Sequence, residues 1–239
     1  MVIYKMSKAL VFDAGPIISL TMNNLLWVLR KLRREFRGSF LITESVKNEL
    51  VDRPIMTKRF KFEAIQVLKE IYTGTLNVVR SETIRNNANR ILELANHTFK
   101  ANNAYIQIVQ RGEIESIAAL KHLNGNAVVI DERTTRMLVE EPENLRNLMQ
   151  SRLHRRVEVN RENLKKLREE LYGVRVIRSA ELITIAYEKG ILDTYVLPSE
   201  MKLYRNLDKQ VLESTLWGLK LNGCSISQRE IEQILKLES

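Results

Sequence analysis

Two short apolar runs, each closed by an aspartate, constrain the fold of this 239-residue chain most strongly. Residues 9–12 (ALVF) end at Asp13, and residues 127–130 (AVVI) end at Asp131. Continuous apolar runs of this length are typical of strands buried on both faces, as in a parallel sheet. Because ligands collect at the carboxyl ends of parallel strands, we expect both aspartates to lie at a ligand site.

Helical patterns separate the predicted strands, which indicates an α/β fold with a mostly parallel sheet covered by helices on both faces. The strands are predicted at 9–12, 40–42, 76–79, 127–130 and 174–177. Helices are predicted at 17–36, 60–72, 84–109 (one long or broken helix) and 113–123. Another helix is predicted after a cap at Thr43, and one at 180–189 between a cap at Ser179 and a stop at Gly190. A last helix is predicted after a capping box from Ser227 to Glu230.

The segment 140–171 differs from the rest because charges of both signs cluster there around regularly spaced leucines. We interpret it as two exposed helices. The leucines of this segment are Leu145, Leu148, Leu164, Leu167 and Leu171.

The charge balance favours a polyanionic partner. Lys and Arg number 38 against 29 Asp and Glu, a net charge of +9, and basic side chains gain free energy by releasing counterions from phosphates. Charges of both signs also suit surface ion-pair networks, so the balance alone does not identify RNA.

Other residue counts exclude several classes of site. The single cysteine, Cys224, excludes an internal disulfide, and three scattered histidines give no zinc spacing. No apolar run approaches the roughly 20 residues needed to cross a bilayer, and the first residues lack the layout of a signal peptide. We therefore expect a cytoplasmic protein with no membrane partner.

Carboxylates give the strongest chemical signal. Asp13 interrupts an apolar run beside a Gly-Pro turn, where an unpaired buried charge would be costly. Together with Asp131 and Glu113, which begins a helix, it could hold a hard divalent cation that activates water for attack on phosphorus. Taken singly, Glu113 could be an ordinary first-turn acid, Glu49 a solvated residue, and Asp131 an N-cap.

Four segments resemble the ordered acidic motifs of PIN domains: VFDAGPIISL at 11–20, ITESVKNEL at 42–50, GEIESIAAL at 112–120 and VVIDERTTR at 128–136. The chain is most similar to prokaryotic members of the VapC-like nuclease superfamily whose first motif ends in Pro-Leu-Ile and whose third motif is Gly-Glu-x-Glu. Segments 174–192 and 223–235 resemble the C-terminal helices of that branch.

The resemblance implies a single PIN-like domain over 1–239, a three-layer α/β/α sandwich around the sheet. It also implies that a charged helical hairpin is inserted at about 139–173 and that a helical extension covers about 198–239.

The resemblance further implies the roles of site residues. The catalytic residues would be Asp13, Glu49, Glu113 and Asp131. The ligands of Mg²⁺ or Mn²⁺ would be Asp13, Glu113 and Asp131, with Glu115 competing with Glu113 for the role of the third acid. Arg133 and Arg136 would contact phosphate. Glu113 fits the family register better than Glu115, and it lies 18 residues before Asp131 (131 minus 113), which resembles the family spacing.

The implied function is that of a metal-dependent endoribonuclease that hydrolyses RNA. The alternative is a non-catalytic or weakly catalytic RNA-binding or complex-forming protein that uses its basic insertion. A toxin blocked by a separate antitoxin would share the nuclease chemistry, and the resemblance also implies a homodimer.

Overall fold

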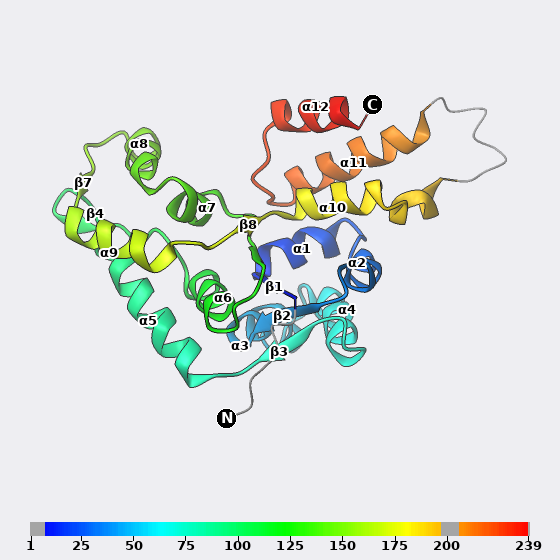
Figure 1. The fold of residues 1–239 in the computed structure, drawn as a ribbon, viewed down its shortest axis with the longest axis horizontal. Helices are drawn as coiled ribbons and strands as arrows, with labels where there is room; N and C mark the ends of the chain where they lie inside the picture. The colour runs from blue at the N-terminus through cyan, green and yellow to red at the C-terminus, as the bar shows by residue number, and fades with distance from the viewer. Residues whose placement is uncertain (1–7, 197–205, 239) are drawn as a thin grey trace.

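A five-stranded parallel sheet forms the centre of the molecule in the computed structural model, which describes residues 8–196 and 206–238 (Figure 1). The strand order across the sheet is β3-β2-β1-β6-β8. In that order the strands are Asn77–Val79, Ser39–Thr43, Ala9–Phe12, Ala127–Val129 and Val176–Ile177. All five predicted strands are present, and the α/β fold is confirmed.

Alternate side chains of the central strands enter two separate cores. On one face Phe12 of β1 joins a cluster with Phe40 and Val129, whereas on the other face Val11 joins a cluster with Val128. Val11 and Val128 lie opposite each other in the register of β1 and β6. Because both faces are buried, the strands are apolar without alternation, as parallel strands in three-layer folds are.

The helices of the first half follow the sequence prediction except at 17–36 and 84–109. They are α1 (Ala14–Met22), α2 (Val28–Phe36), α3 (Glu44–Lys47), the π-helical turn η1 (Asn48–Asp52), the 3-10 turn η2 (Pro54–Met56), α4 (Lys61–Tyr72), α5 (Glu82–Asn96) and α6 (Arg111–His122). The helix predicted at 17–36 is two helices, because Asn23 ends α1 and Asn24 takes a left-handed conformation with φ of 56°.

The helix predicted at 84–109 is wrong in its second half. After α5 the chain forms a hairpin of β4 (Phe99–Ala101) and β5 (Ala104–Tyr105). Its turn residues, Asn102 and Asn103, have φ of 51° and 62°, and asparagine tolerates this left-handed conformation better than most residues do.

The segment 140–171 contains two helices, but they are not simply exposed. After α7 (Arg133–Glu140), the chain forms α8 (Pro142–Leu153), β7 (Glu158–Val159) and α9 (Arg161–Leu171). Four of the five leucines are buried in the second core, with Leu148 partly buried against it, and β7 pairs with β4. That this segment is an insertion stays a prediction.

The C-terminal helices cover the side of the molecule on which α1 lies, and they are drawn above α1 in Figure 1. They are α10 (Ser179–Glu188), the 3-10 turn η3 (Ile191–Tyr195), α11 (Leu207–Leu221) and α12 (Gln228–Leu237). The predicted capping box of Ser227 and Glu230 is confirmed. The predicted extension begins in residues 197–205, outside those described. No helix within 8–196 and 206–238 has the length and apolarity to cross a membrane.

Candidate active site

Asp13 lies where β1 ends and α1 begins. Its backbone N–H still donates to the Val129 carbonyl at 3.0 Å, so the residue is held at the tip of the sheet. Its side chain caps α1, with Oδ2 accepting the Gly15 N–H at 3.4 Å. Only 6% of Asp13 is exposed. The predicted turn is wrong, because β1 leads directly into α1 and Gly15 and Pro16 lie in that helix. The buried carboxylate therefore lies at the start of a helix, where the partial positive charge favours it.

A cavity of about 220 Å³ gathers the acids that the sequence singled out. Its lining residues are Asp13, Gly15, Ile18, Glu49, Gln110, Gly112, Glu113, Asp131, Glu132 and Gly223. All four predicted catalytic acids lie in this wall, although they come from four different segments of the chain. We call this hollow the acid cavity.

Two glycines bring backbone close to the carboxylates. A Cβ placed on Gly112 would lie 3.7 Å from both Asp13 Oδ1 and Glu49 Oε2. A Cβ on Gly15 would lie 3.7 Å from Asp13 Oδ2 and from the Cβ of Asp131. The missing side chains keep open the space between the carboxylates.

Glu113 is held by two donors from separate segments. Its Oε2 accepts the backbone N–H of Gln110 at 2.9 Å and the hydroxyl of Thr135 at 2.7 Å. Burial raises the pKa of Glu113, and these two hydrogen bonds oppose that rise. The first bond belongs to the start of α6, whereas the second fixes the carboxylate to α7.

Glu49 is the most exposed of the four acids and lies in the π-helical turn η1. Such turns occur often at functional sites because they displace a side chain from the regular helical position. Partial desolvation raises the pKa of Glu49, and the nearby Arg53 guanidinium opposes the rise.

Asp131 has both carboxylate oxygens bound to one residue. Ser179 donates its backbone N–H to Oδ1 and its hydroxyl to Oδ2, each at 2.7 Å. The prediction that Ser179 caps α10 is wrong, because the N-cap residue is Arg178 and the Ser179 side chain turns to Asp131 instead. The alternative role of Asp131 as an N-cap is also wrong, since Glu132 caps α7.

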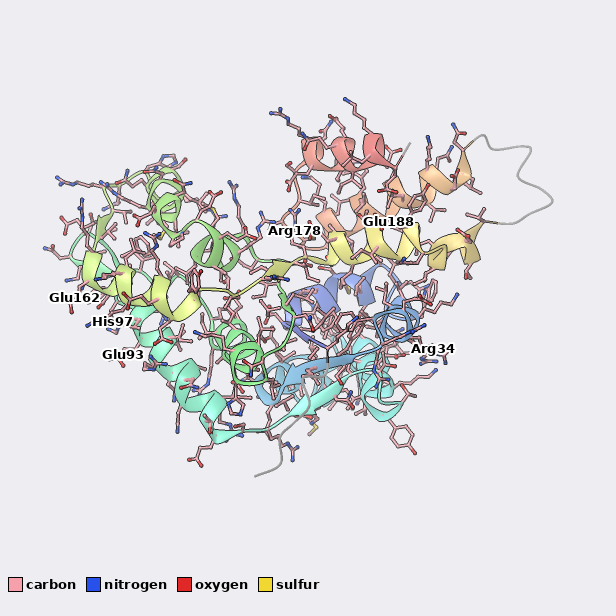
Figure 2. The ribbon with its side chains drawn as sticks, in the orientation of Figure 1. Arg34, Glu93, His97, Glu162, Arg178 and Glu188 are labelled. Atoms are coloured by element: carbon pink, nitrogen blue, oxygen red, sulfur yellow. The ribbon has the colours of Figure 1, made fainter. Side chains whose placement is uncertain are left out.

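The C-terminal part of the chain closes this side of the site. The Ser225 N–H donates to the Asp131 carbonyl at 3.1 Å, and Gly223 lines the acid cavity. Arg178, labelled in Figure 2 where β8 meets α10, donates to the Ser225 carbonyl and to Glu230 of α12. Burial and the charge of Asp131 raise the pKa of the adjacent Cys224 thiol to about 12, so this thiol stays protonated.

Uncompensated negative charge characterises the cavity. Burial raises the pKa of Asp13 to about 7, and the neighbouring carboxylates of Glu113 and Glu49 contribute to the rise. Among the described residues, no Lys, Arg or His lines the cavity, so no lining side chain in that part of the chain neutralises the acids. A cation bound from solution would neutralise these acids.

Three predicted site residues lie outside the lining. Glu115 is buried in α6 but does not line the acid cavity, which favours Glu113 over it as the third acid. Arg133 is exposed at the first position of α7, and Arg136 lies 3.7 Å from Glu140 of the same helix. Their contact with phosphate stays a prediction.

The sequence interpretation missed three polar residues that belong to the site. Glu132 lines the cavity beside Asp131, and its position directly after that acid was the available signal. Thr135 and Ser179 hold two of the acids, but nothing in their local sequence marks them, because their partners lie 22 and 48 residues away.

The oxygen atoms of the lining acids suit a hard cation that keeps part of its hydration shell. All the acids offer oxygen, which Mg²⁺ and Mn²⁺ prefer. Within the described residues, however, no group of three or more His, Cys, Asp or Glu side chains is arranged to hold a metal ion directly. Mg²⁺ commonly keeps several waters and binds one or two carboxylates, and Asp13 and Glu49, which face the same space beside Gly112, fit that requirement.

Comparison with known families matched residues 9–146, more than half of the chain, to a family model described as a PIN domain. The match begins at β1, includes the four predicted catalytic acids and ends within α8. It does not reach segments 174–192 and 223–235. No curated protein and no solved structure matched the chain.

Proposed function

The chain belongs to the PIN-domain family, whose members are generally nucleases, and from this premise we propose that it is a metal-dependent endoribonuclease. One observation carries the proposal. Carboxylates from four separate segments line one cavity at the carboxyl end of a parallel sheet, and no cationic side chain of residues 8–196 and 206–238 lines that cavity. A purely structural cluster of this kind would be costly, since buried like charges repel and lose hydration.

Asp13 and Glu49 would hold the divalent cation, with Asp131 and Glu113 in the same cavity wall. A bound Mg²⁺ or Mn²⁺ would supply a polarised phosphoryl oxygen and a water of lowered pKa. Around neutral pH the cation competes with the proton on Asp13, whose pKa is about 7.

The remaining contacts orient these groups. Ser179 holds the Asp131 carboxylate in one orientation through two hydrogen bonds, and Thr135 does the same for one oxygen of Glu113. A site held by buried partners keeps its ligands in position before substrate arrives, which lowers the cost of reorganisation. The net charge of +9 on the whole chain favours the approach of RNA to an otherwise acidic cavity.

The test is metal-dependent cleavage of a single-stranded RNA by the wild type and by Asp13→Asn, Glu113→Gln and Glu115→Gln. We expect the first two substitutions to reduce the rate by at least about 100-fold, because each removes a charge from the cavity wall. Glu115→Gln is the matched control and should retain most of the rate. Cleavage that survives Asp13→Asn, in protein free of contaminating nuclease, would contradict the proposed site.

A further inference from the structure

A second hollow, of about 720 Å³, lies between α8 and α9 and shares no lining residue with the acid cavity. Helix α8 packs against α7, and α9 packs against α5, so the two helices stand apart over a floor that includes Phe99, Val159 and Leu164. Figure 2 labels Glu162 of α9 and His97 at the end of α5 on this side of the molecule. We call the hollow the α8–α9 groove.

The walls of the groove are basic. Four cations line it, against two carboxylates, Glu143 and Glu169; the cations are Arg146, Arg161, Lys165 and Arg168. Arg168 lies 3.2 Å from Glu143, but both side chains are more than 60% exposed, and such pairs contribute little free energy. They can therefore exchange for other partners.

Two of these cations have no ion-pair partner in the part of the chain that the structure describes. Neither Arg161 nor Lys165 forms a salt bridge or a side-chain hydrogen bond with any other described residue, and both side chains are exposed. Arg146 differs, because its Nε donates to the Val157 carbonyl at 3.0 Å, which fixes its guanidinium in the wall. The groove thus combines one anchored cation with two that are available to an anion.

An aromatic side chain completes the groove. Tyr172, directly after α9, lines the groove and is 88% exposed. An aromatic ring this exposed gains little from the core of its own chain, whereas an unstacked base can stack on it. Cations for phosphates beside a ring for a base form the pattern that binds single-stranded nucleic acid. An acidic peptide would use the cations but would not need the ring.

We propose that the α8–α9 groove binds a segment of single-stranded RNA, with phosphates on Arg161 and Lys165 and a base on Tyr172. The inference rests on the proposed function in one respect: the bound segment would be part of the RNA whose cleaved bond lies in the acid cavity. Helix α8 is linked to that cavity, because Arg152 donates to the Thr134 hydroxyl at 3.2 Å and the next residue, Thr135, contacts Glu113.

Binding of a fluorescent single-stranded RNA of about ten nucleotides, measured by anisotropy with full-length Asp13→Asn protein, tests the proposal without cleavage. Adding Arg161→Ala and Lys165→Ala together should weaken binding by at least about tenfold and reduce the slope of log affinity against log salt by about 1.4, since each phosphate contact contributes about 0.7 for a single strand. Adding Tyr172→Ala instead should weaken binding by at least about fivefold and leave that slope unchanged.

The matched control adds Lys31→Ala and Arg34→Ala, which remove two exposed cations of α2; Figure 2 shows Arg34 on the far side from Glu162. We expect this control to bind RNA with nearly the affinity of the Asp13→Asn parent. Equal weakening by the control pair would reduce the effect to overall charge and overturn the proposal. Unchanged RNA binding in the groove variants would also overturn the proposal. If Tyr172→Ala binds RNA with unchanged affinity and poly-glutamate displaces that RNA, the groove is assigned to an acidic protein instead.

The outcome separates the two proposals. If wild-type protein does not cleave RNA but the groove variants lose binding, the groove stands and the nuclease proposal falls. If the wild type cleaves and the groove variants bind RNA as tightly as Asp13→Asn does, the nuclease proposal stands and the groove falls.

Discussion

Ser179 donates both its backbone N–H and its hydroxyl to the two oxygens of Asp131, each at 2.7 Å. Ser179 and Asp131 are buried, at 0% and 2% exposed. The first residue of α10 therefore fixes an acid at the tip of β6. This contact ties the part of the chain that carries the acid motifs to its C-terminal helices.

Removal of the Ser179 hydroxyl should destabilise the fold. Ser179→Ala leaves Asp131 Oδ2 buried without that donor, and an unsatisfied buried acceptor costs about 1–3 kcal/mol. Urea denaturation in EDTA measures the change in the free energy of unfolding. Ser225→Ala is the matched control, because the buried Ser225 hydroxyl has no hydrogen-bond partner among the described residues. We expect the control to be neutral, and equal losses from both would assign the effect to packing.

The sequence predicted the acids of the site better than the residues that hold them. Asp13 and Asp131 are marked locally, because each ends an apolar run that only a buried strand explains. Thr135 and Ser179 are not, since a hydroxyl near a helix start has the same local pattern whether it caps the helix or reaches a distant carboxylate. Contacts across 22 or 48 residues depend on tertiary packing.

The errors in the fold have similar causes. The hairpin after α5 was missed because its strands have three and two residues, too short for a period-two pattern to stand out. The charges around the leucines of α8 and α9 predict exposed helices, but an amphipathic helix buries one stripe of its surface. Leu145 and Leu167, both 0% exposed, lie on those stripes.

Asp13 should make metal-free stability fall as pH rises. The folded chain keeps the Asp13 proton up to about pH 7, whereas the unfolded chain releases it near the ordinary pKa of 3.8. The folded state binds the extra proton between these values, so the contribution is favourable below pH 4 and is lost on the way to pH 7. Asp13→Asn should remove this loss and exceed the wild type by roughly 2–4 kcal/mol at pH 8 in EDTA.

Thermal or urea unfolding of both proteins at pH 4.5 and pH 8 measures this difference. Mg²⁺ or Mn²⁺ should raise the stability of the wild type at pH 8, because a ligand that binds only the folded state stabilises it, and should not stabilise Asp13→Asn. A stability difference that is independent of pH would show that Asp13 is ionised throughout.

Thr135 should set the pH range of the proposed RNA cleavage. Its hydrogen bond favours the ionised form of Glu113, so Thr135→Val should raise the pKa of that carboxyl further. The acidic limb of the rate profile for RNA cleavage should move to higher pH, with a several-fold loss at pH 6 and a smaller loss at pH 9. Thr134→Val is the control, because the Thr134 hydroxyl contacts Arg152 and none of the acids. Parallel losses at every pH would indicate a packing defect.

Substitution of Gly112 by alanine should raise the stability of the fold and lower its activity. It lies in the first turn of α6 in an ordinary helical conformation, where alanine is favoured over glycine by about 0.5–1 kcal/mol. The new Cβ would lie 3.7 Å from Asp13 Oδ1 and Glu49 Oε2, which is ordinary van der Waals contact, so the fold tolerates it. The same methyl group would occupy the space between the two carboxylates that we assign to the cation and its waters.

Gly112→Ala should therefore raise the free energy of unfolding by up to about 1 kcal/mol in EDTA while it lowers metal-dependent cleavage by at least about tenfold. Asn86→Ala, at an exposed position inside α5, is the matched control and should gain helix stability without a change in cleavage. Titration of Mn²⁺ against the cleavage rate should show a higher midpoint for Gly112→Ala, because the methyl group excludes water ligands. A more stable variant with unchanged metal dependence would show that the cation binds elsewhere in the cavity.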